Sequence, residues 1–293
     1  MCTTLCCGTP RHRLLGVEYV ISIGALVETL ETTPTGQNSP SCAVLTDVGR
    51  VRERNEDLAA ADLQKGVYIL ADGMGGHPDG NLASQIAVDT AMAYVTKKQV
   101  PGRPRDRGDK LAAAIVAANR AILERSTAPE GTAGMGTTIV CLWLGKRWVH
   151  IAHVGDSRIY RFRDGEIEQL TRDHTVVQAL LDRGEIDPDA PEFMQLGHIL
   201  TQAVGLDPAM TPVVARLPAR TGDVYLLCSD GLTDLVRDSA IAAILGAKGA
   251  DPHAAAEALI AAALSAGGND NITVIVARDD LPRQSRVTAK PKD

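Results

Sequence analysis

Two strand patterns that end in Asp-Gly constrain this chain more than any other feature. Residues 67–76 read Val-Tyr-Ile-Leu-Ala-Asp-Gly-Met-Gly-Gly, and residues 224–231 read Val-Tyr-Leu-Leu-Cys-Ser-Asp-Gly. Each apolar run has the length of a buried strand and leads to a single carboxylate, Asp72 or Asp230, which we expect in the following loop. Glycine at position 73 allows close approach of the backbone and leaves its carbonyl free to face a ligand. Carboxylates that strand ends bring to one place indicate a site for a hard cation.

An Asp-Gly pair after an apolar run is also a common hairpin turn, so the metal hypothesis depends on several positions together. Two further acidic positions are Asp156, in Gly-Asp-Ser-Arg, and Asp270, in Gly-Asn-Asp-Asn. The charged segment 50–57 lies between two strand patterns, where an arginine can offer a planar fork to phosphate. Glu56 or Asp57 in that segment can support a cation, although a charge run is more often a solvated face.

Bulk composition excludes several classes of protein. A length of 293 residues suits one large domain or two small ones. The net charge of −6 argues against nucleic acid or an anionic membrane as a partner. No segment reaches the roughly 18 apolar residues that span a bilayer. The six cysteines include no Cys-x-x-Cys pair and do not resemble a disulfide scaffold, so we expect a cytoplasmic protein.

The order of the predicted elements indicates an α+β fold with sheets in the middle and helices outside. Strands are followed by two helices, then by strands with an insertion at about 171–205, two more helices and a last strand. The insertion contains a helix that Asp173 can cap, and its length is typical of a functional flap. We expect residues 41–278 to form the folded domain, residues 1–40 to be a poorly ordered extension, and residues 279–293 to be a disordered tail.

Other catalytic chemistries find little support in the sequence. No glycine loop matches the P-loop pattern for nucleotides. Ser157 and Ser229 lack an evident His–Asp arrangement for nucleophilic catalysis. His150 and His153 share one strand pattern without the further ligands of a zinc site.

Seven motifs follow one another along the chain. They are Asp47-Val-Gly-Arg-Val-Arg-Glu-Arg-Asn-Glu-Asp57, Ala71-Asp-Gly-Met-Gly-Gly-His77, Gly134-Met-Gly-Thr-Thr138, Val154-Gly-Asp-Ser-Arg158, Leu170-Thr-Arg-Asp-His174, Ser229-Asp-Gly-Leu232 and Gly268-Asn-Asp-Asn-Ile-Thr273. Together they resemble the metal-dependent protein serine/threonine phosphatases, the protein phosphatase 2C-like family, in its bacterial form. The resemblance covers residues 42–278.

This resemblance implies an αββα four-layer sandwich, in which helix pairs flank two central antiparallel sheets. It also implies two Mn²⁺ or Mg²⁺ ions at one edge of the sheets, with a third, weaker ion as a further option. By position, Asp72 would bridge the two ions and the carbonyl of Gly73 would bind one of them. Asp230 and Asp270 would complete the ligands, and Asp156 matches the position of the third ion.

The same resemblance assigns roles beside the ions. Glu56 would act on the metal through water, Asp57 would support the ligands, and Arg52 would hold the substrate phosphate. Segment 171–205 would be the flap beside the substrate groove. Some relatives carry a proton-donating His where this chain has Met74, so we expect a metal-held water, with His77 as the weaker alternative, to protonate the leaving group.

The implied activity is hydrolysis of phosphoserine and phosphothreonine in proteins by a water that bridges the two ions. Its partners would be phosphorylated proteins and an opposing Ser/Thr protein kinase, and we expect a monomer. Two alternatives share the fold: a catalytically inactive module that binds a phosphoprotein, and a hydrolase of small phosphate esters. Loss of one bridging or terminal carboxylate would favour the inactive module, but Asp72, Asp230 and Asp270 are all present.

Overall fold

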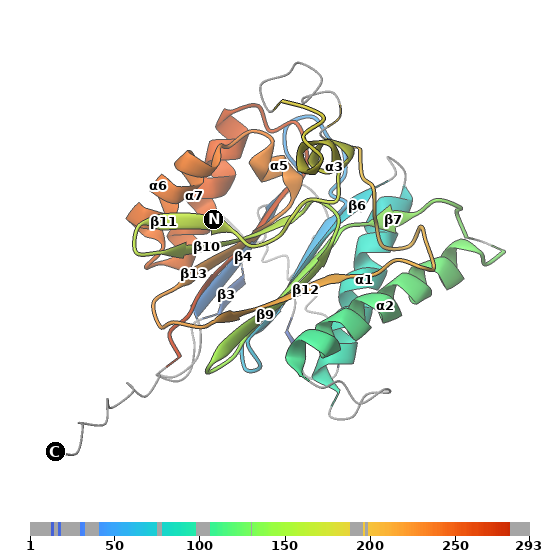
Figure 1. The fold of residues 1–293 in the computed structure, drawn as a ribbon, viewed down its shortest axis with the longest axis horizontal. Helices are drawn as coiled ribbons and strands as arrows, with labels where there is room; N and C mark the ends of the chain where they lie inside the picture. The colour runs from blue at the N-terminus through green and yellow to red at the C-terminus, as the bar shows by residue number, and fades with distance from the viewer. Residues whose placement is uncertain are drawn as a thin grey trace, which may run out of the picture.

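The computed structural model describes residues 13–14, 17–18, 30–32, 41–74, 78–97, 106–129, 131–187, 196 and 199–281. Within them, two six-stranded antiparallel sheets lie face to face, with a pair of long helices on each outer face (Figure 1). This arrangement confirms the predicted α+β fold and its αββα layers. None of the helices described is long and apolar enough to cross a membrane.

The first sheet has the strand order β11-β10-β13-β14-β4-β3. Its strands are β3 (Leu30–Thr32), β4 (Ser41–Asp47), β10 (Arg158–Arg163), β11 (Glu166–Gln169), β13 (Val224–Cys228) and β14 (Ile272–Arg278). Helices α6 (Asp238–Lys248) and α7 (Pro252–Ser265) cover its outer face.

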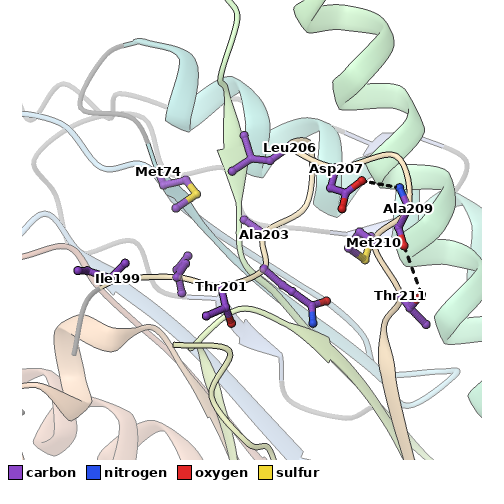
Figure 2. Close-up of a pocket in the computed structure, with 11 residues that line it drawn as sticks. Met74, Ile199, Thr201, Ala203, Leu206, Asp207, Ala209, Met210 and Thr211 are labelled. Atoms are coloured by element: carbon purple, nitrogen blue, oxygen red, sulfur yellow. Dashed lines mark hydrogen bonds between the residues drawn. The ribbon is translucent and has the colours of Figure 1, made fainter. Parts of the chain in front are cut away.

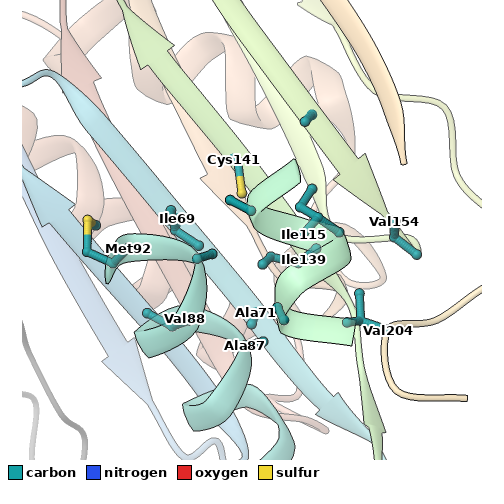
Figure 3. Packing of buried hydrophobic residues seen from close by; sticks show 14 of the residues in the cluster. Ile69, Ala71, Ala87, Val88, Met92, Ile115, Ile139, Cys141, Val154 and Val204 are labelled. Carbon is teal, nitrogen blue, oxygen red and sulfur yellow. The ribbon is translucent and has the colours of Figure 1, made fainter. Parts of the chain in front are cut away.

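The second sheet has the order β12-β9-β8-β6-β5, and the short β7 (Gly136–Thr137) pairs with the end of β6. Its other strands are β5 (Asp57–Asp62), β6 (Val67–Met74), β8 (Ile139–Leu144), β9 (Trp148–Val154) and β12 (Val213–Pro218). Helices α1 (Pro78–Thr96) and α2 (Arg107–Ser126) cover its outer face, where Ile69 and Ala71 of β6 pack beside Ala87 and Val88 of α1 (Figure 3).

Three buried clusters separate the four layers, and strand alternation decides which side chain enters which cluster. On β6, Ile69 and Ala71 face α1 and α2, whereas Tyr68 and Leu70 face the other sheet. Because both faces of the central strands are covered, these strands read as continuous apolar runs in the sequence. The face that carries Tyr68 and Leu70 continues to position 72.

Two local predictions were wrong. Asp72 does not lie in a loop: β6 continues to Met74, because β5 and β7 both pair with its end. Helix α3 (Val176–Asp182) is capped by Thr175, which accepts a hydrogen bond from the amide of Gln178. Asp173 does not cap it and instead receives hydrogen bonds from the guanidinium of Arg158.

The chain ends are described only in part. Of residues 1–40, the structure describes β1 (Arg13–Leu14), β2 (Val17–Glu18) and β3, and β3 extends the first sheet along β4. The predicted tail is described as far as residue 281. Gly75, Gly76 and His77 lie outside the described residues, as does part of the expected flap.

Candidate metal centre

The acidic side chains of the site come from strand faces that look into the space between the two sheets. Asp57 and Asp72 are paired directly across β5 and β6. Asp72 follows Tyr68 and Leu70 on the inter-sheet face, and Asp57 precedes Ala59 on the same face of β5. The alternation that places apolar side chains of β5 and β6 in the inter-sheet core therefore also places both carboxylates on the inter-sheet face, at the edge of that core.

Asp57 is buried, with 4% of its surface exposed. Its Oδ2 accepts a hydrogen bond from the hydroxyl of Ser229 at 2.8 Å, whereas its buried Oδ1 has no hydrogen-bond partner. Burial, opposed in part by hydrogen bonds such as that from Ser229, raises the pKa of Asp57 to about 6, and the charge of Asp270 contributes to this rise. A buried carboxylate oxygen without a donor is suited to a cation or to water held by one.

Three further carboxylates join this pair from distant parts of the chain. Asp230 is the first residue of the short helix α5 (Asp230–Thr233), Asp156 lies in the turn between β9 and β10, and Asp270 precedes β14. Burial, followed by the negative charges of Asp57, Asp230, Asp156 and Asp270, raises the pKa of Asp72 well above its ordinary value. The structure thus brings together a carboxylate cluster, which consists of Asp57, Asp72, Asp156, Asp230 and Asp270.

The cluster is short of positive charge. Burial and the charges of Asp156, Asp234 and Asp270 also raise the pKa of Asp230 well above its ordinary value. For Asp156, burial raises the pKa to about 6, with Asp173 as the next cause. Carboxyl groups whose pKa values rise through mutual repulsion gain strongly from a bound cation, which reverses that effect.

Arg52 places a guanidinium at the rim of this cluster. Its Nη2 donates to Oδ2 of Asp270 at 2.6 Å, and 48% of its side chain is exposed. Partial burial disfavours the charged form of Arg52, but the hydrogen bond to Asp270 and the charges of Asp270, Glu56 and Asp230 outweigh it and raise its pKa. A guanidinium has five N–H donors, so the contact with Asp270 leaves donors for an incoming anion.

Glu56 and Gly73 lie where β6 meets the first turn of α1. The amide of Gly73 donates to the carbonyl of Glu56 at 3.1 Å, and the hydroxyl of Ser84 donates to the same carbonyl at 2.6 Å. A Cβ built on Gly80 would lie 2.3 Å from Oε2 of Glu56, so that carboxylate lies directly over the start of α1. The predicted site residues Arg52, Glu56 and Gly73 therefore flank the carboxylate cluster.

Sequence reasoning missed the polar residues that hold the acidic loops in register. Asn271 donates to the carbonyls of Val48 and Arg54 and accepts from the amide of Glu56, so it ties segment 48–56 to the Asp270 loop. Thr138 exchanges hydrogen bonds with the backbone of Asp72. These residues occur within the quoted motifs, and a polar residue directly before an apolar strand run was the available signal.

The donor set fits hard divalent cations. Among the described residues, no three His, Cys, Asp or Glu side chains converge closely enough to hold one ion by themselves. Mn²⁺ and Mg²⁺ usually take only one or two carboxylates each and complete their coordination with carbonyl oxygens and water. An all-oxygen set of separated carboxylates beside a glycine carbonyl matches that preference and does not match zinc.

A pair of histidines links the Asp156 turn to the segment that enters α3. The rings of His153 and His174 stack with their centroids 4.9 Å apart. His174 Nδ1 accepts from the amide of Gly155 at 3.2 Å, and the amide of His174 donates to the carbonyl of Gly155 at 3.0 Å. The carbonyl of His174 also accepts from the amide of Thr201 at 2.8 Å. One residue thus joins the turn that carries Asp156 to segment 199–201.

We expect His174→Asn to reduce the loss of stability that acid causes. Burial, then the neighbouring His153, lowers the pKa of His174 to about 4. A folded-state pKa below the unfolded value of about 6.5 means that stability is lost as the pH falls from about 6.5 towards 4. Asparagine can accept the Gly155 hydrogen bond but does not ionise. Urea unfolding at pH 7.5 and pH 5 should therefore show a smaller drop for the variant, and equal drops would contradict this account.

Comparisons with known proteins find relatives that match most of this chain. The family model for protein phosphatase 2C matches residues 50–265. The serine/threonine phosphatase stp of Listeria monocytogenes is 35% identical over 251 residues, which cover 82% of this chain and 96% of that protein. The serine/threonine protein phosphatase PstP of Mycobacterium tuberculosis is 40% identical over 236 residues, or 80% of this chain, but the match spans only 44% of that protein's length. A crystal structure of the catalytic domain of PstP in complex with 2 manganese ions has a TM-score of 0.71 and 38% identity, over 82% of this chain and 98% of that one.

Proposed function

Because this chain belongs to the protein phosphatase 2C family, we propose that it hydrolyses phosphoserine and phosphothreonine in proteins with a water activated by two Mn²⁺ or Mg²⁺ ions. The observation that carries the proposal is the carboxylate cluster, whose partly or fully buried acids have raised pKa values and lie beside the guanidinium of Arg52. Phosphate-ester hydrolysis has one of the highest uncatalysed barriers, so it requires concentrated positive charge at the phosphoryl group.

We propose the following division of roles. Asp72, which pairs with Asp57 across the strands and feels the charge of Asp230, would bridge the two ions, and the carbonyl of Gly73, Asp230 and Asp270 would hold them. Glu56 would act through water, and Asp156 would hold a third, weaker ion. When bound, the two ions supply the activated water and neutralise charge on the phosphoryl oxygens.

Arg52 is proposed to receive the substrate phosphate. Its guanidinium lies at the rim of the cluster and is half exposed, so an anion from solvent can reach it. The pairing with Asp270 holds the long side chain in place before substrate binds. A planar fork of N–H donors matches phosphoryl oxygens in two-point contact and adds orientation to charge.

Met74 leaves the proton donor to another group. Its thioether carries no proton, and His77 lies outside the described residues.

We also propose that the enzyme is a cytoplasmic monomer that opposes a Ser/Thr protein kinase. The names of two bacterial relatives, both serine/threonine phosphatases, support the choice of phosphoserine and phosphothreonine, which are the products of such a kinase.

The decisive test is hydrolysis of a phosphothreonine peptide after chelation, with Mn²⁺ or Mg²⁺ added back, by the wild type and by Asp230→Asn. We expect chelation to abolish activity, either ion to restore it in the wild type, and the variant to stay about a hundredfold or more below it, because one charged stabiliser of the transition state is commonly worth that much. Asp62→Asn is the matched control, since Asp62 is also buried but pairs with Lys65 outside the cluster.

Three other outcomes would count against the proposal. Full activity in the presence of chelator would exclude the metal mechanism. Turnover of p-nitrophenyl phosphate without turnover of the peptide would favour a small-ester hydrolase. No turnover of either substrate by the folded protein with either ion would favour a phosphoprotein-binding module.

A further inference from the structure

A groove of about 700 Å³ lies between the end of β6 and segment 199–211 (Figure 2). Met74, Ile199 and Leu206 lie towards one end of it, and Asp207 and Met210 lie towards the other. Ile199 and Leu206 are each 48% exposed, which is unusual for large apolar side chains that share one concave surface. The groove therefore presents an apolar wall to solvent.

This wall is held in place by the fold. The backbones of Val204 and Thr137 exchange two hydrogen bonds, of 2.8 and 3.0 Å. The buried Asn119 of α2 accepts from the amide of Gly205 at 2.6 Å and donates to the carbonyl of Asp207 at 2.8 Å. Leu206 lies between these two anchored positions, so its exposed side chain is fixed at the surface and does not fold back into the core.

The groove begins at Met74, two residues along β6 from Asp72 of the carboxylate cluster. Asp72 and Met74 are two residues apart on β6 and so lie on the same face of the strand. Two residues of strand span about 7 Å. Consecutive Cα atoms of a bound peptide are about 3.8 Å apart, so a side chain one or two residues from the reacting phosphoresidue reaches the groove.

We infer that this groove selects substrate proteins that carry a large apolar side chain within two residues of the phosphoresidue. The inference rests on the proposed function and adds a substrate preference to it. An apolar side chain would remove Met74, Ile199 and Leu206 from water and gain their contacts. An acidic side chain would be repelled by Asp207 and would meet no lysine or arginine among the described residues that line the groove.

Phosphothreonine peptides with Leu, Lys or Glu at each of the two positions before and after the phosphoresidue test this inference. We expect Leu at one of these positions to raise kcat/KM about tenfold over Glu, the scale at which hydrophobic pockets discriminate. In Leu206→Glu that ratio should fall to about one. Val116→Glu is the matched control, because Val116 is also 48% exposed but lies on α2 and does not line the groove. It should keep the wild-type ratio.

The outcomes separate the inference from the function on which it rests. Hydrolysis of all peptides at similar rates would overturn the preference and leave the phosphatase activity intact. Hydrolysis of none would overturn both. An unchanged Leu-to-Glu ratio in Leu206→Glu, or a dimer of the wild type that this variant abolishes, would show that substrates do not occupy the groove. Ile199→Glu repeats the test from the same end of the groove, and a melting curve of each variant shows that it is folded.

Discussion

Asp72→Asn is expected to lower turnover of a phosphothreonine peptide about a thousandfold or more, and to make the metal-free protein more stable. The loss of turnover follows from the proposed role, because the amide cannot carry the charge with which Asp72 would bridge the ions, and one such electrostatic contact is commonly worth 10²–10³ in rate. The gain in stability follows because burial and four neighbouring carboxylates raise the pKa of Asp72. The close carboxylates that favour cation binding also repel one another and lower the stability of the metal-free protein.

The sign of the stability effect depends on pH. The folded-state pKa of Asp72 lies above the unfolded value of about 3.9, so its protonated form stabilises the fold fully below that value. This contribution is lost as the pH rises through the raised pKa. At pH 7.5 the ionised carboxylate is therefore unfavourable, whereas asparagine keeps the shape without the charge.

Thermal unfolding at pH 7.5 in EDTA measures this effect. We expect the melting temperature of Asp72→Asn to exceed that of the wild type, and Mn²⁺ to raise the wild-type value more than the variant value. Asp62→Asn, a change of buried Asp outside the cluster, should leave the response to Mn²⁺ unaltered. A variant that is less stable than the wild type in EDTA, or that binds Mn²⁺ equally well, would remove Asp72 from the proposed role.

Gly73→Ala is expected to lower the free energy of unfolding by about 3 kcal/mol or more, at the upper end of ordinary point mutations. A Cβ on residue 73 would lie 2.1 Å from the carbonyl oxygen of Gly80 and 2.7 Å from that of Glu56. Both obstacles are backbone atoms, so either α1 must move away from β6 or the hydrogen bond between Gly73 and Glu56 must break. Each movement would also displace the Gly73 carbonyl from its proposed place beside the ions.

The measurement is a melting curve together with peptide hydrolysis. For a domain of this size, a loss of about 3 kcal/mol corresponds to a fall of roughly 6 °C or more in melting temperature. Gly246→Ala, in the last turn of α6, is the matched control. Its Cβ would meet only the end of the Phe162 ring, at 3.3 Å, and alanine favours a helix by about 1 kcal/mol. A Gly73→Ala protein that melts within about 2 °C of the wild type would contradict the steric argument.

The sequence alone was sufficient for the fold class and for the identity of the acidic residues. Continuous apolar runs such as residues 67–71 and 224–228 marked strands with both faces covered, and the helix pairs between them required layers outside the sheets. The carboxylates that follow those runs were recognisable because a charge at the end of a buried strand needs a partner. These features could be predicted because a strand that is buried on both faces has apolar side chains at consecutive positions of the sequence.

Tertiary structure decided what depends on contacts between distant segments. Asp72 lies within a strand because β7, more than 60 residues away, adds hydrogen bonds to its neighbours Gly73 and Met74. The guanidinium of Arg158 donates hydrogen bonds to Asp173, so Thr175 and not Asp173 caps α3. Asn119 and Asn271 hold loops that are far from them in sequence, and the groove exists only where Leu206 meets Met74. Hydrogen bonds and apolar contacts form between segments that folding brings together. The spacing of residues along the chain does not show which distant segments will become neighbours.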